Sequence, residues 1–317
     1  MPVKYFICPD GEWVRLEQCI ASGGCRLHKR CLTQATLISL AEQREWKGIP
    51  SVTQLLKGTK EQFLLITQDY AEDPDDIAFR FDGTSMHNEL ESQDVEGSVI
   101  EERFTTSHGI TGAPDILETE DGWHILTDYK KSGAFKVSKA LGMEEYVYDH
   151  PTEVYKQKAY MTIGGVKVSR LAGEPKVIKG HKPNFSKREC FDWDMQVNYY
   201  RIGLEEKGHR IDEMRIQALV RDGGTASATK YGLKKRFYLI PVPHIDNEFV
   251  IEYFLRKKAQ LEHALQYGWN EPCTPEEHWN GRKCDKFCSV KMFCEYSPHY
   301  GKKEEVQADD TDTDTTE

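Results

Sequence analysis

The segment ITGAPDILETEDGWHILTDYKKSG, residues 110 to 133, constrains the fold more than any other part of the chain. Two runs rich in β-branched and aromatic residues flank the turn residues EDG, so the segment predicts a hairpin of antiparallel strands. Strands disfavour aspartate, yet Asp115 begins the first run and Asp128 lies two residues before Lys130 in the second. Because residues two apart on a strand share a face, we expect these three side chains to meet at one place.

Two carboxylates that converge on one point attract a hard cation such as Mg²⁺ or Mn²⁺. Such an ion polarises a phosphoryl oxygen and generates hydroxide, while a nearby lysine orients the attacking water or stabilises developing charge. This is the chemistry of phosphodiester hydrolysis. The alternative interpretation is a surface hairpin with incidental charges.

The rest of the chain predicts a mixed α/β core without internal repeats. Helical patterns cover residues 34–46, 51–65, 83–92, 151–164, 192–208 and 246–268. Strand patterns cover residues 97–106, 113–119, 123–130, 212–222 and 236–242. The last helix has the clearest signals, because Asp246 is a typical N-cap and Gly268 occupies the position of a C-terminal capping glycine.

Composition and charge limit the function classes. With 317 residues, of which 38% are hydrophobic, the chain can bury a sizeable core. It has no apolar run of roughly 20 residues and no signal-peptide pattern, so we expect no membrane partner and a cytoplasmic location. A net charge of −10 argues against a uniformly basic nucleic-acid coat. Lys234, Lys235 and Arg236 form a local basic run, which is either a DNA contact or a solvated face.

Four motifs occur in one order along the chain: GTxxHxxLE from Gly83, GxPD ending at Asp115, DYK at residues 128–130 and QVNYY from Gln196. This order resembles the RecB-like branch of the PD-(D/E)xK nuclease superfamily over roughly residues 50 to 295. The resemblance implies a restriction-endonuclease-like α/β core, in which helices flank a central mixed sheet.

The resemblance also implies roles for single residues. His87, Asp115 and Asp128 match the family's metal ligands, the backbone carbonyl of Tyr129 completes the protein ligands, and Lys130 is the catalytic lysine. On the strand before Asp115, Glu101 or Glu102 is either an aid to a second metal or a solvated glutamate.

The resemblance further implies that Gln196 and Tyr200 form the family's QxxxY helix, a DNA-contacting element that supports the active site. The similar QKAY at residues 157–160 is one residue too short for that pattern. We therefore interpret it as a face of the helix predicted over residues 151–164.

Eight of the nine cysteines fall into two groups at opposite ends of the chain, and Cys190 stands apart. The N-terminal cysteines are Cys8, Cys19, Cys25 and Cys31, and the C-terminal cysteines are Cys273, Cys284, Cys288 and Cys294. Without a secretory signal, clustered cysteines more often bind metal than form disulfides. Thiolates bind either zinc or an iron–sulfur cluster, and ligand softness does not choose between them.

The C-terminal cysteines resemble the cysteine triplet of iron–sulfur nucleases in the same branch, the AddB-type and CRISPR-adaptation enzymes. That resemblance implies a [4Fe–4S] cluster on Cys284, Cys288 and Cys294, with Cys273 or one N-terminal cysteine as the fourth ligand. This chain departs from the family's pattern, because it has Cys-x3-Cys where the family usually has Cys-x2-Cys. The remaining N-terminal cysteines, with His28 between two of them, predict a zinc site. Two separate four-cysteine sites are the simplest interpretation, and a single cluster with spare thiols is the alternative.

We therefore predict a metal-dependent deoxyribonuclease with four parts. These are a cysteine-rich metal-binding segment (1–35), a RecB-like nuclease core (36–270), a C-terminal cysteine cap (271–300) and a disordered acidic tail (301–317). The chain lacks a GxxxxGK[ST] motif, so it resembles a standalone phage or repair exonuclease that works beside a single-strand annealing protein or a helicase, in a bacterial or phage-infected cell. Two alternatives stay open: a CRISPR-adaptation nuclease that trims DNA for an integrase, and a non-catalytic DNA-binding module.

Overall fold

The structure is a computed structural model that describes residues 3–21, 25–42, 46–78, 83, 86, 89–90, 92–93, 95–163 and 166–302. His87, within the helix predicted over 83–92, and most of the tail predicted to be disordered lie outside the described residues. None of the helices in the described ranges has the length and apolar character needed to cross a membrane.

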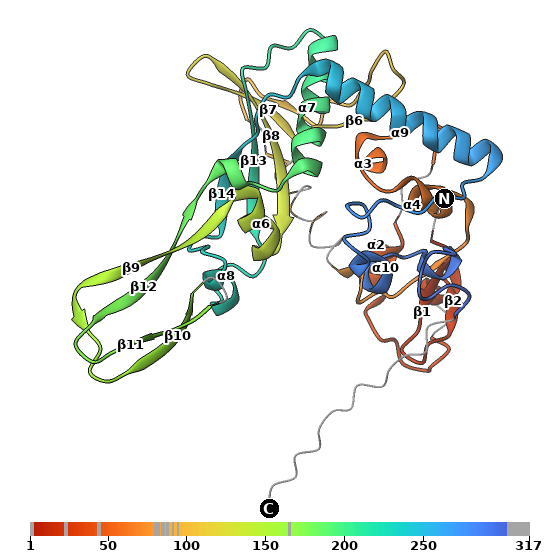
Figure 1. The fold of residues 1–317 in the computed structure, drawn as a ribbon. Helices are drawn as coiled ribbons and strands as arrows, with labels where there is room; N and C mark the ends of the chain where they lie inside the picture. The colour runs from red at the N-terminus through yellow and green to blue at the C-terminus, as the bar shows by residue number, and fades with distance from the viewer. Residues whose placement is uncertain are drawn as a thin grey trace, which may run out of the picture.

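A five-stranded mixed sheet forms the centre of the fold (Figure 1), as the predicted mixed α/β class requires. Its order is β14 (Phe237–Pro241), β13 (Glu213–Val220), β8 (Trp123–Ser132), β7 (Ile116–Glu120) and β4 (Val99–Ile100). Strand β13 runs parallel to β8, and the other neighbouring pairs are antiparallel. The predicted hairpin is confirmed: Glu120 pairs with Trp123, and Asp121 and Gly122 between them adopt φ values of 51° and 83°.

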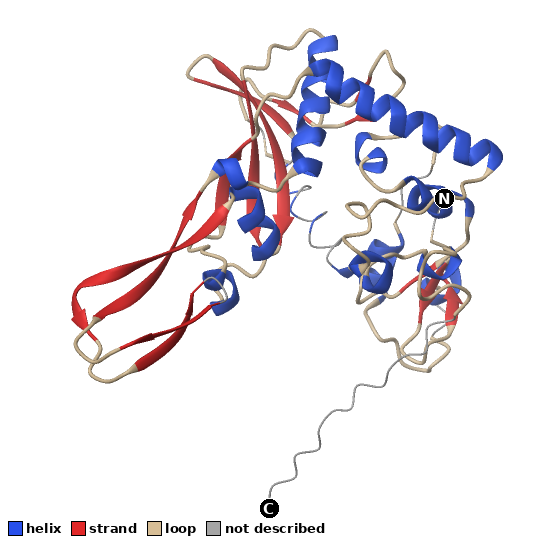
Figure 2. Ribbon diagram, viewed as in Figure 1, coloured by secondary structure: helices blue, strands red, loops and turns tan. Residues whose placement is uncertain are grey.

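A parallel pair of strands needs a crossover connection, and α6 (Ala134–Leu141) and α7 (Phe191–Glu206) lie within the one between β8 and β13. Figure 2 shows both helices beside the sheet, and each contacts β13. Asp222, in the loop after β13, accepts a 2.7 Å hydrogen bond from the Ala134 amide. It thereby caps α6, whose N-cap residue Gly133 has no side chain to do so.

Helix α7 is buried around its whole circumference from residue 193 to residue 204. It contacts β8 and β13 as well as α9 (Asn247–Tyr267), which crosses the top of the molecule in Figure 1. Helix α9 confirms its prediction, since Asp246 accepts a 3.1 Å bond from the Phe249 amide and Gly268 is the C-cap with φ 87°. A helix enclosed in this way can carry polar side chains only if they find partners.

Three predicted elements are shorter or split. The helix over 51–65 is wrong as one piece: it divides into α3 (Val52–Leu55) and α4 (Thr59–Thr67), because Gly58 adopts an extended conformation as the N-cap of α4. The helix over 34–46 is α2 (Gln34–Ala41), which ends before Glu42. The strand over 97–106 divides into β4 and β5 (Phe104–Thr105) at Glu101, whose φ is 46°.

The helix predicted over residues 151–164 is wrong, because this region belongs to a two-stranded arm that projects from the sheet (Figure 1). The arm pairs β9 (Met143–Val154) with β12 (Pro175–Pro183), and β10 (Ala159–Ile163) with β11 (Val166–Arg170). The interpretation of residues 157–160 as a helix face is therefore also wrong. The segment is rich in β-branched and aromatic residues, and cross-strand pairing outweighs the helical spacing.

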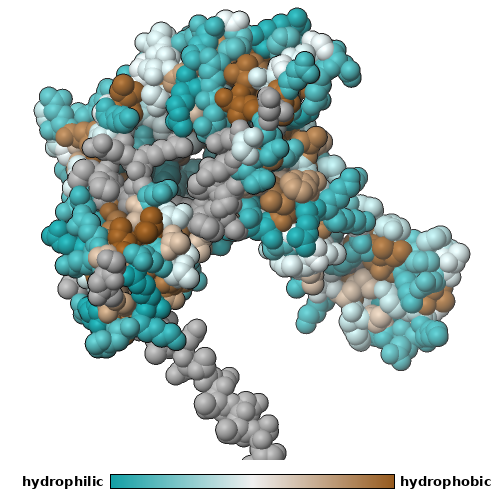
Figure 3. Space-filling model, turned by 180° about the vertical axis from the view of Figure 1, so that it is seen from behind, coloured by the Kyte–Doolittle hydropathy of each residue, from teal (hydrophilic) through white to brown (hydrophobic). Residues whose placement is uncertain are grey.

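Figure 3 shows hydrophobic residues on the surface of this arm, seen at the lower right. Exposed members include Val147, Val154, Val166 and Leu171. Tyr146 and Tyr148 stack with ring centroids 5.7 Å apart, and Tyr146 lies across Gly180 on the partner strand.

The two ends of the chain form a second lobe. Strand β1 (Tyr5–Ile7) pairs with β2 (Trp13–Arg15) and with β3 (Ala71–Glu72), which comes from the range predicted as nuclease core. Val290 of the C-terminal segment packs with Val3 and Tyr70. The remaining elements are α1 (Leu16–Ile20), β6 (Thr111–Gly112), η1 (Phe185–Lys187), α8 (Ala226–Lys230), α10 (Arg282–Lys286) and η2 (Lys291–Phe293).

Candidate active site

The register of the central hairpin brings Asp115 next to Asp128. Ile116 pairs with Thr127, so the residues one step further along each strand, Asp115 and Asp128, lie opposite each other. Both are buried, with 7% and 2% of their surface exposed. Asp115 Oδ2 accepts a 2.5 Å hydrogen bond from the backbone amide of Tyr129, which holds its carboxylate against β8.

Lys130 lies beside the two carboxylates. Its Nζ is 2.7 Å from Asp128 Oδ2, and 21% of its side chain is exposed. Burial alone lowers the pKa of Lys130, but the negative charges of Asp128 and Asp115 outweigh burial and hold the pKa above its usual value. The ammonium is therefore protonated at neutral pH. Two carboxylates and one ammonium leave a net charge of −1 in this cluster.

Helix α7 contributes Gln196 and Tyr200 to the same cluster. Gln196 Nε2 donates a 2.8 Å hydrogen bond to the Tyr200 hydroxyl. Burial first, and then the charge of Asp128, raises the pKa of Tyr200, so its hydroxyl stays neutral beside the carboxylates. Both side chains are buried, with 6% and 5% of their surface exposed. The Tyr200 ring therefore has little open surface for base stacking, and its hydroxyl lies near the charges of Asp128 and Lys130.

The donor set of Asp115 and Asp128 fits a hard divalent cation, because oxygen donors with a net negative charge suit Mg²⁺ and Mn²⁺. Among the described residues, no three His, Cys, Asp or Glu side chains are grouped so as to hold a metal ion. The third predicted ligand, His87, lies outside the described residues, and the carbonyl role of Tyr129 stays a prediction.

Glu101 and Glu102, the two glutamates before Asp115, both lie near basic side chains. Glu102 lies 2.7 Å from Lys207 Nζ and 2.5 Å from His209 Nε2, and the hydrogen bond from Lys207 lowers the pKa of Glu102. Glu101 lies 3.8 Å from Arg103. Ion pairs therefore account for these charges better than a second metal does.

The basic run lies at the same end of the sheet as Lys130. Lys130 is level with Ala218 on β13, and Ala218 pairs with Tyr238 on β14. The run of residues 234–236 comes just before Tyr238, is exposed, and is held by two backbone bonds to the Tyr238 hydroxyl. Since β14 is two strands from β8, a distance of ~10 Å separates these strands.

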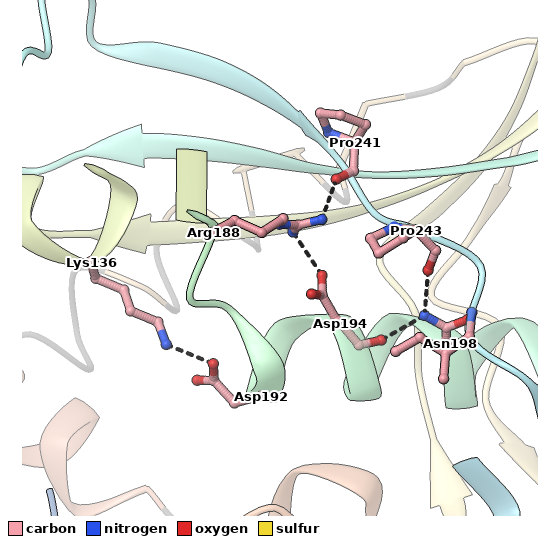
Figure 4. Close-up of polar contacts among 8 residues, drawn as sticks. Lys136, Arg188, Asp192, Asp194, Asn198, Pro241 and Pro243 are labelled. Carbon is pink, nitrogen blue, oxygen red and sulfur yellow. Dashed lines mark hydrogen bonds and ion pairs between the residues drawn. The ribbon is translucent and has the colours of Figure 1, made fainter. Parts of the chain in front are cut away.

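A polar contact that sequence analysis missed anchors the start of α7 to the edge strand (Figure 4). Arg188 donates to the Pro241 carbonyl at 2.9 Å and to Asp194 Oδ1 at 2.7 Å. Burial raises the pKa of Asp194 to about 6, although the Arg188 charge opposes this shift. Lys136 of α6 pairs with Asp192 at 2.6 Å in the same view.

Asn198, between Gln196 and Tyr200, anchors the same helix to the loop after β14. It is fully buried, and its Nδ2 donates to the carbonyls of Asp194 at 2.8 Å and Pro243 at 3.0 Å. Its Oδ1 accepts from the Ile245 amide at 2.9 Å. In the sequence, the signal for these contacts is the polar residues Asp194 and Asn198, which lie between apolar residues of α7. The contacts of Arg188 and Asn198 fix the position of α7, and therefore which of its side chains face the sheet.

The two cysteine groups line separate cavities. The N-terminal cysteines line a cavity of about 330 Å³, together with Lys29, Arg30 and three apolar residues or prolines. The C-terminal cysteines line a cavity of about 20 Å³, with Lys60, Glu61 and Val290 among its other residues. The second volume is little more than one water molecule occupies.

Three ion pairs, each with one buried partner (Lys60, Lys257 or Glu61), tie the C-terminal segment to the core. Lys60 of α4 donates to Glu295 at 2.8 Å and to the Trp269 carbonyl at 2.6 Å. Lys257 of α9 pairs with Glu277 at 2.5 Å, and Lys283 pairs with Glu61 of α4 at 2.5 Å. Removal of Glu295, Glu277 or Lys283 leaves the charge of its buried partner without an ion pair, so these pairs stabilise the position of the cap.

No protein-family model matches the chain, and no curated protein matches it. Among solved structures, the chain is similar to one described as "Crystal structure of SSO0001", with 12% sequence identity and a TM-score of 0.34. The match covers 83% of this chain and 93% of that chain. A likeness at this level carries no argument about fold or function.

Proposed function

We propose that the protein is a metal-dependent deoxyribonuclease whose active site consists of Asp115, Asp128 and Lys130, supported by Gln196 and Tyr200. The observation that carries the proposal is that Asp115, just before β7, lies beside Asp128 and Lys130 of β8, with the Tyr200 hydroxyl of α7, itself bonded to Gln196, close to all three. Two of the four sequence motifs, GxPD and DYK, meet across one strand pair. The QxxxY motif reaches them from a helix that begins about sixty residues later in the chain.

The chemistry follows from the charges in this cluster. A bound divalent cation supplies a Lewis acid and a water of lowered pKa. Asp115 and Asp128 supply its oxygen donors, and the Tyr129 amide fixes the orientation of Asp115. Lys130 stays protonated and stabilises negative charge that develops on the phosphoryl oxygens. Gln196 and Tyr200 act as positioning residues, because both are buried, Tyr200 lies near Asp128 and Lys130, and Gln196 is bonded to Tyr200.

DNA contacts beyond the active site are assigned to Lys234, Lys235 and Arg236. Their position at the Lys130 end of the sheet supports this assignment, because DNA that enters the site from this edge passes over them. Charge at this edge contributes affinity through phosphate contacts, without sequence preference.

The test offers anaerobically purified protein 5′- and 3′-labelled single-stranded and duplex DNA with Mg²⁺ or Mn²⁺. We expect cleavage, and we expect Asp128→Asn or Lys130→Ala to lower its rate by at least ~10²-fold, because each change removes a ligand or an electrostatic contact to the transition state. Asp149→Ala is the control, since Asp149 is an exposed carboxylate on the projecting arm. Circular dichroism must show each variant folded.

Two outcomes contradict the proposal. Full cleavage by folded Asp128→Asn, with contaminating nuclease excluded, removes this site from the reaction. DNA binding without cleavage by the wild type, with either metal, identifies a non-catalytic DNA-binding module instead.

The C-terminal cysteines stay candidate ligands of a [4Fe–4S] cluster. Their four thiols line one cavity, which supports a common centre. The ion pairs at Lys60, Lys257 and Lys283 hold this segment independently of any metal.

A further inference from the structure

The projecting arm carries two exposed tyrosine rings that do not belong to the core. Tyr146 and Tyr148 lie two residues apart on β9, so they share one face of the arm. Their exposed fractions are 39% and 46%, and neither packs in the main hydrophobic cluster. The acidic Glu145 and Asp149 alternate with them and therefore lie on the opposite face. A ribbon of two strands has no interior for large side chains, so the surface of these rings is available to a partner.

The two rings form one ordered platform. Their centroids are 5.7 Å apart, and their planes differ by 21°. Tyr146 lies flat against Gly180 of β12, since a Cβ at Gly180 would lie 2.5 Å from Tyr146 Cζ. Two residues further along β12, Lys182 places its Nζ 5.7 Å from the centroid of the Tyr146 ring. Nearly parallel rings with a cation beside them are the groups on which the bases of a single strand stack.

The arm has more basic than acidic side chains, and most of its carboxylates are already paired. Residues 143–183 contain seven Lys or Arg residues and five Glu or Asp residues. Four of the carboxylates form ion pairs: Glu144 with Lys187, Glu145 with Lys179, Asp149 with Arg170 and Glu153 with Lys176. Within the described part of the arm, four exposed lysines have no carboxylate partner: Lys156, Lys158, Lys167 and Lys182. These positive charges complement the phosphates of a nucleic acid.

The base of the arm lies beside the basic run of residues 234–236. A Cβ at Gly232, whose φ is 80°, would overlap His181 and lie 2.8 Å from Met143 Cε. The loop before the basic run therefore packs on both strands of the arm where they leave the core, and α8 lies at this place in Figure 1. Tyr146 is three residues from Met143 along β9, a distance of ~10 Å. Basic side chains and then aromatic rings thus follow one another from the Lys130 end of the sheet onto the arm.

We propose that the arm binds single-stranded DNA, with Tyr146 and Tyr148 stacked on bases and the lysines of the arm in contact with phosphates. A single strand fits better than a duplex, because the faces of paired bases are covered by their neighbours and cannot reach an aromatic ring. The inference rests on the proposed function and deepens it, since it names the form of DNA that the active site receives and a surface that holds it outside that site.

DNA binding by full-length protein tests this inference. Fluorescence anisotropy is measured with labelled single-stranded and duplex DNA, without added divalent cation, so that cleavage does not interfere. Tyr146→Ala/Tyr148→Ala should weaken binding of single-stranded DNA ~10-fold and leave its salt dependence unchanged, because stacking does not depend on charge. Duplex binding should stay as in wild type. The matched control is Tyr267→Ala, which removes a tyrosine that is 70% exposed at the end of α9 and should bind as wild type does.

A second variant tests the charges and does not depend on the tyrosines. Lys156→Ala/Lys158→Ala/Lys167→Ala changes three exposed side chains near the tip of the arm. It should lower the slope of log affinity against log salt concentration by ~2, since each phosphate contact to a single strand contributes ~0.7. Circular dichroism must show both variants folded.

Four outcomes overturn the inference. The first is wild-type affinity for single-stranded DNA in the folded tyrosine variant, and the second is an unchanged salt slope in the lysine variant. The third is an equal loss of duplex binding in the tyrosine variant, because the rings then do not stack on bases. The fourth is a wild-type dimer that the tyrosine variant converts to a monomer in light scattering, which identifies this face as a contact between two copies of the chain.

Failure of the inference is distinguishable from failure of the proposed function. Cleavage by the wild type, together with unchanged DNA binding by both arm variants, removes the arm from DNA binding and leaves the nuclease. Weakened binding by the arm variants, together with no cleavage by the wild type under any condition, removes the nuclease and leaves the arm as a surface for single-stranded DNA.

Discussion

Gly58→Ala tests how closely the C-terminal segment approaches α4. Gly58 is the N-cap of α4, with φ −62° and ψ 138°, a conformation that alanine adopts without strain. A Cβ at this position would overlap the Cys273 sulfur and lie 3.1 Å from both Cys273 Cβ and Glu277 Oε2. Glu277 cannot retreat easily, because it pairs with the buried Lys257 at 2.5 Å and accepts the Thr274 amide at 2.9 Å.

The expected magnitude comes from comparison with Gly133→Ala. Gly133 has a similar backbone, with φ −70° and ψ 158°, but a Cβ there would make only ordinary contacts, at 3.7 Å to Arg221 and 3.9 Å to Asp222. Both variants gain ~0.4–1 kcal/mol because alanine restricts the unfolded chain, so this contribution cancels between them. Overpacking remains, and it lowers the free energy of unfolding of Gly58→Ala by about 1–3 kcal/mol relative to Gly133→Ala.

Urea unfolding followed by circular dichroism measures this difference, with both variants at the same pH and protein concentration. Alkylation of Cys273 gives a second measurement, since displacement of the sulfur should change its accessibility and weaken any metal centre on the C-terminal cysteines. If Gly58→Ala is as stable as Gly133→Ala, the close packing of Cys273 on α4 is wrong.

Three further changes probe α7. Asn198→Ala should lower the free energy of unfolding by about 1–3 kcal/mol, because the buried Asn198 amide loses its part-buried bonds to the Pro243 carbonyl and the Ile245 amide. Urea unfolding measures this loss, and an unchanged stability contradicts the anchoring role. Asp194 has a pKa of about 6 when folded and 3.8 as its ordinary value, so its contribution to stability is present at low pH and lost as the pH rises through about 6. Wild type should therefore gain about 1.4 kcal/mol over Asp194→Asn between pH 7.5 and pH 5, and parallel pH profiles of the two proteins would refute the raised pKa. Tyr200→Phe should cost ~1 kcal/mol of stability and slow DNA cleavage roughly 10-fold, because the Lys130 cluster loses its support. The exposed Tyr160, changed to Phe, should do neither, and equal effects at both positions would remove Tyr200 from the site.

Several elements were predictable because local signals determine them. The hairpin that carries Asp115 and Asp128 follows from alternating residues around a two-residue turn, and register then places the two carboxylates opposite each other. Helix α9 follows from its N-cap and its capping glycine. In both cases the sequence contains the turn chemistry as well as the apolar pattern, and the two agree.

Only the tertiary structure decided which side chains from distant segments meet. Residues 151–164 of the projecting arm were wrongly predicted as a helix: the end of β9 in this region pairs with the distant β12, while β10 pairs with β11, the next strand along the chain. Likewise, Tyr200 lies near Asp128 because α7 packs on β8 and β13 and is anchored by Arg188 to β14 and by Asn198 to the loop after it. The separation of the cysteines into two cavities also required the fold, since spacing along the chain does not say which thiols face one another. Local propensity selects helices and turns, whereas the position of a site depends on contacts that form only when the chain is folded.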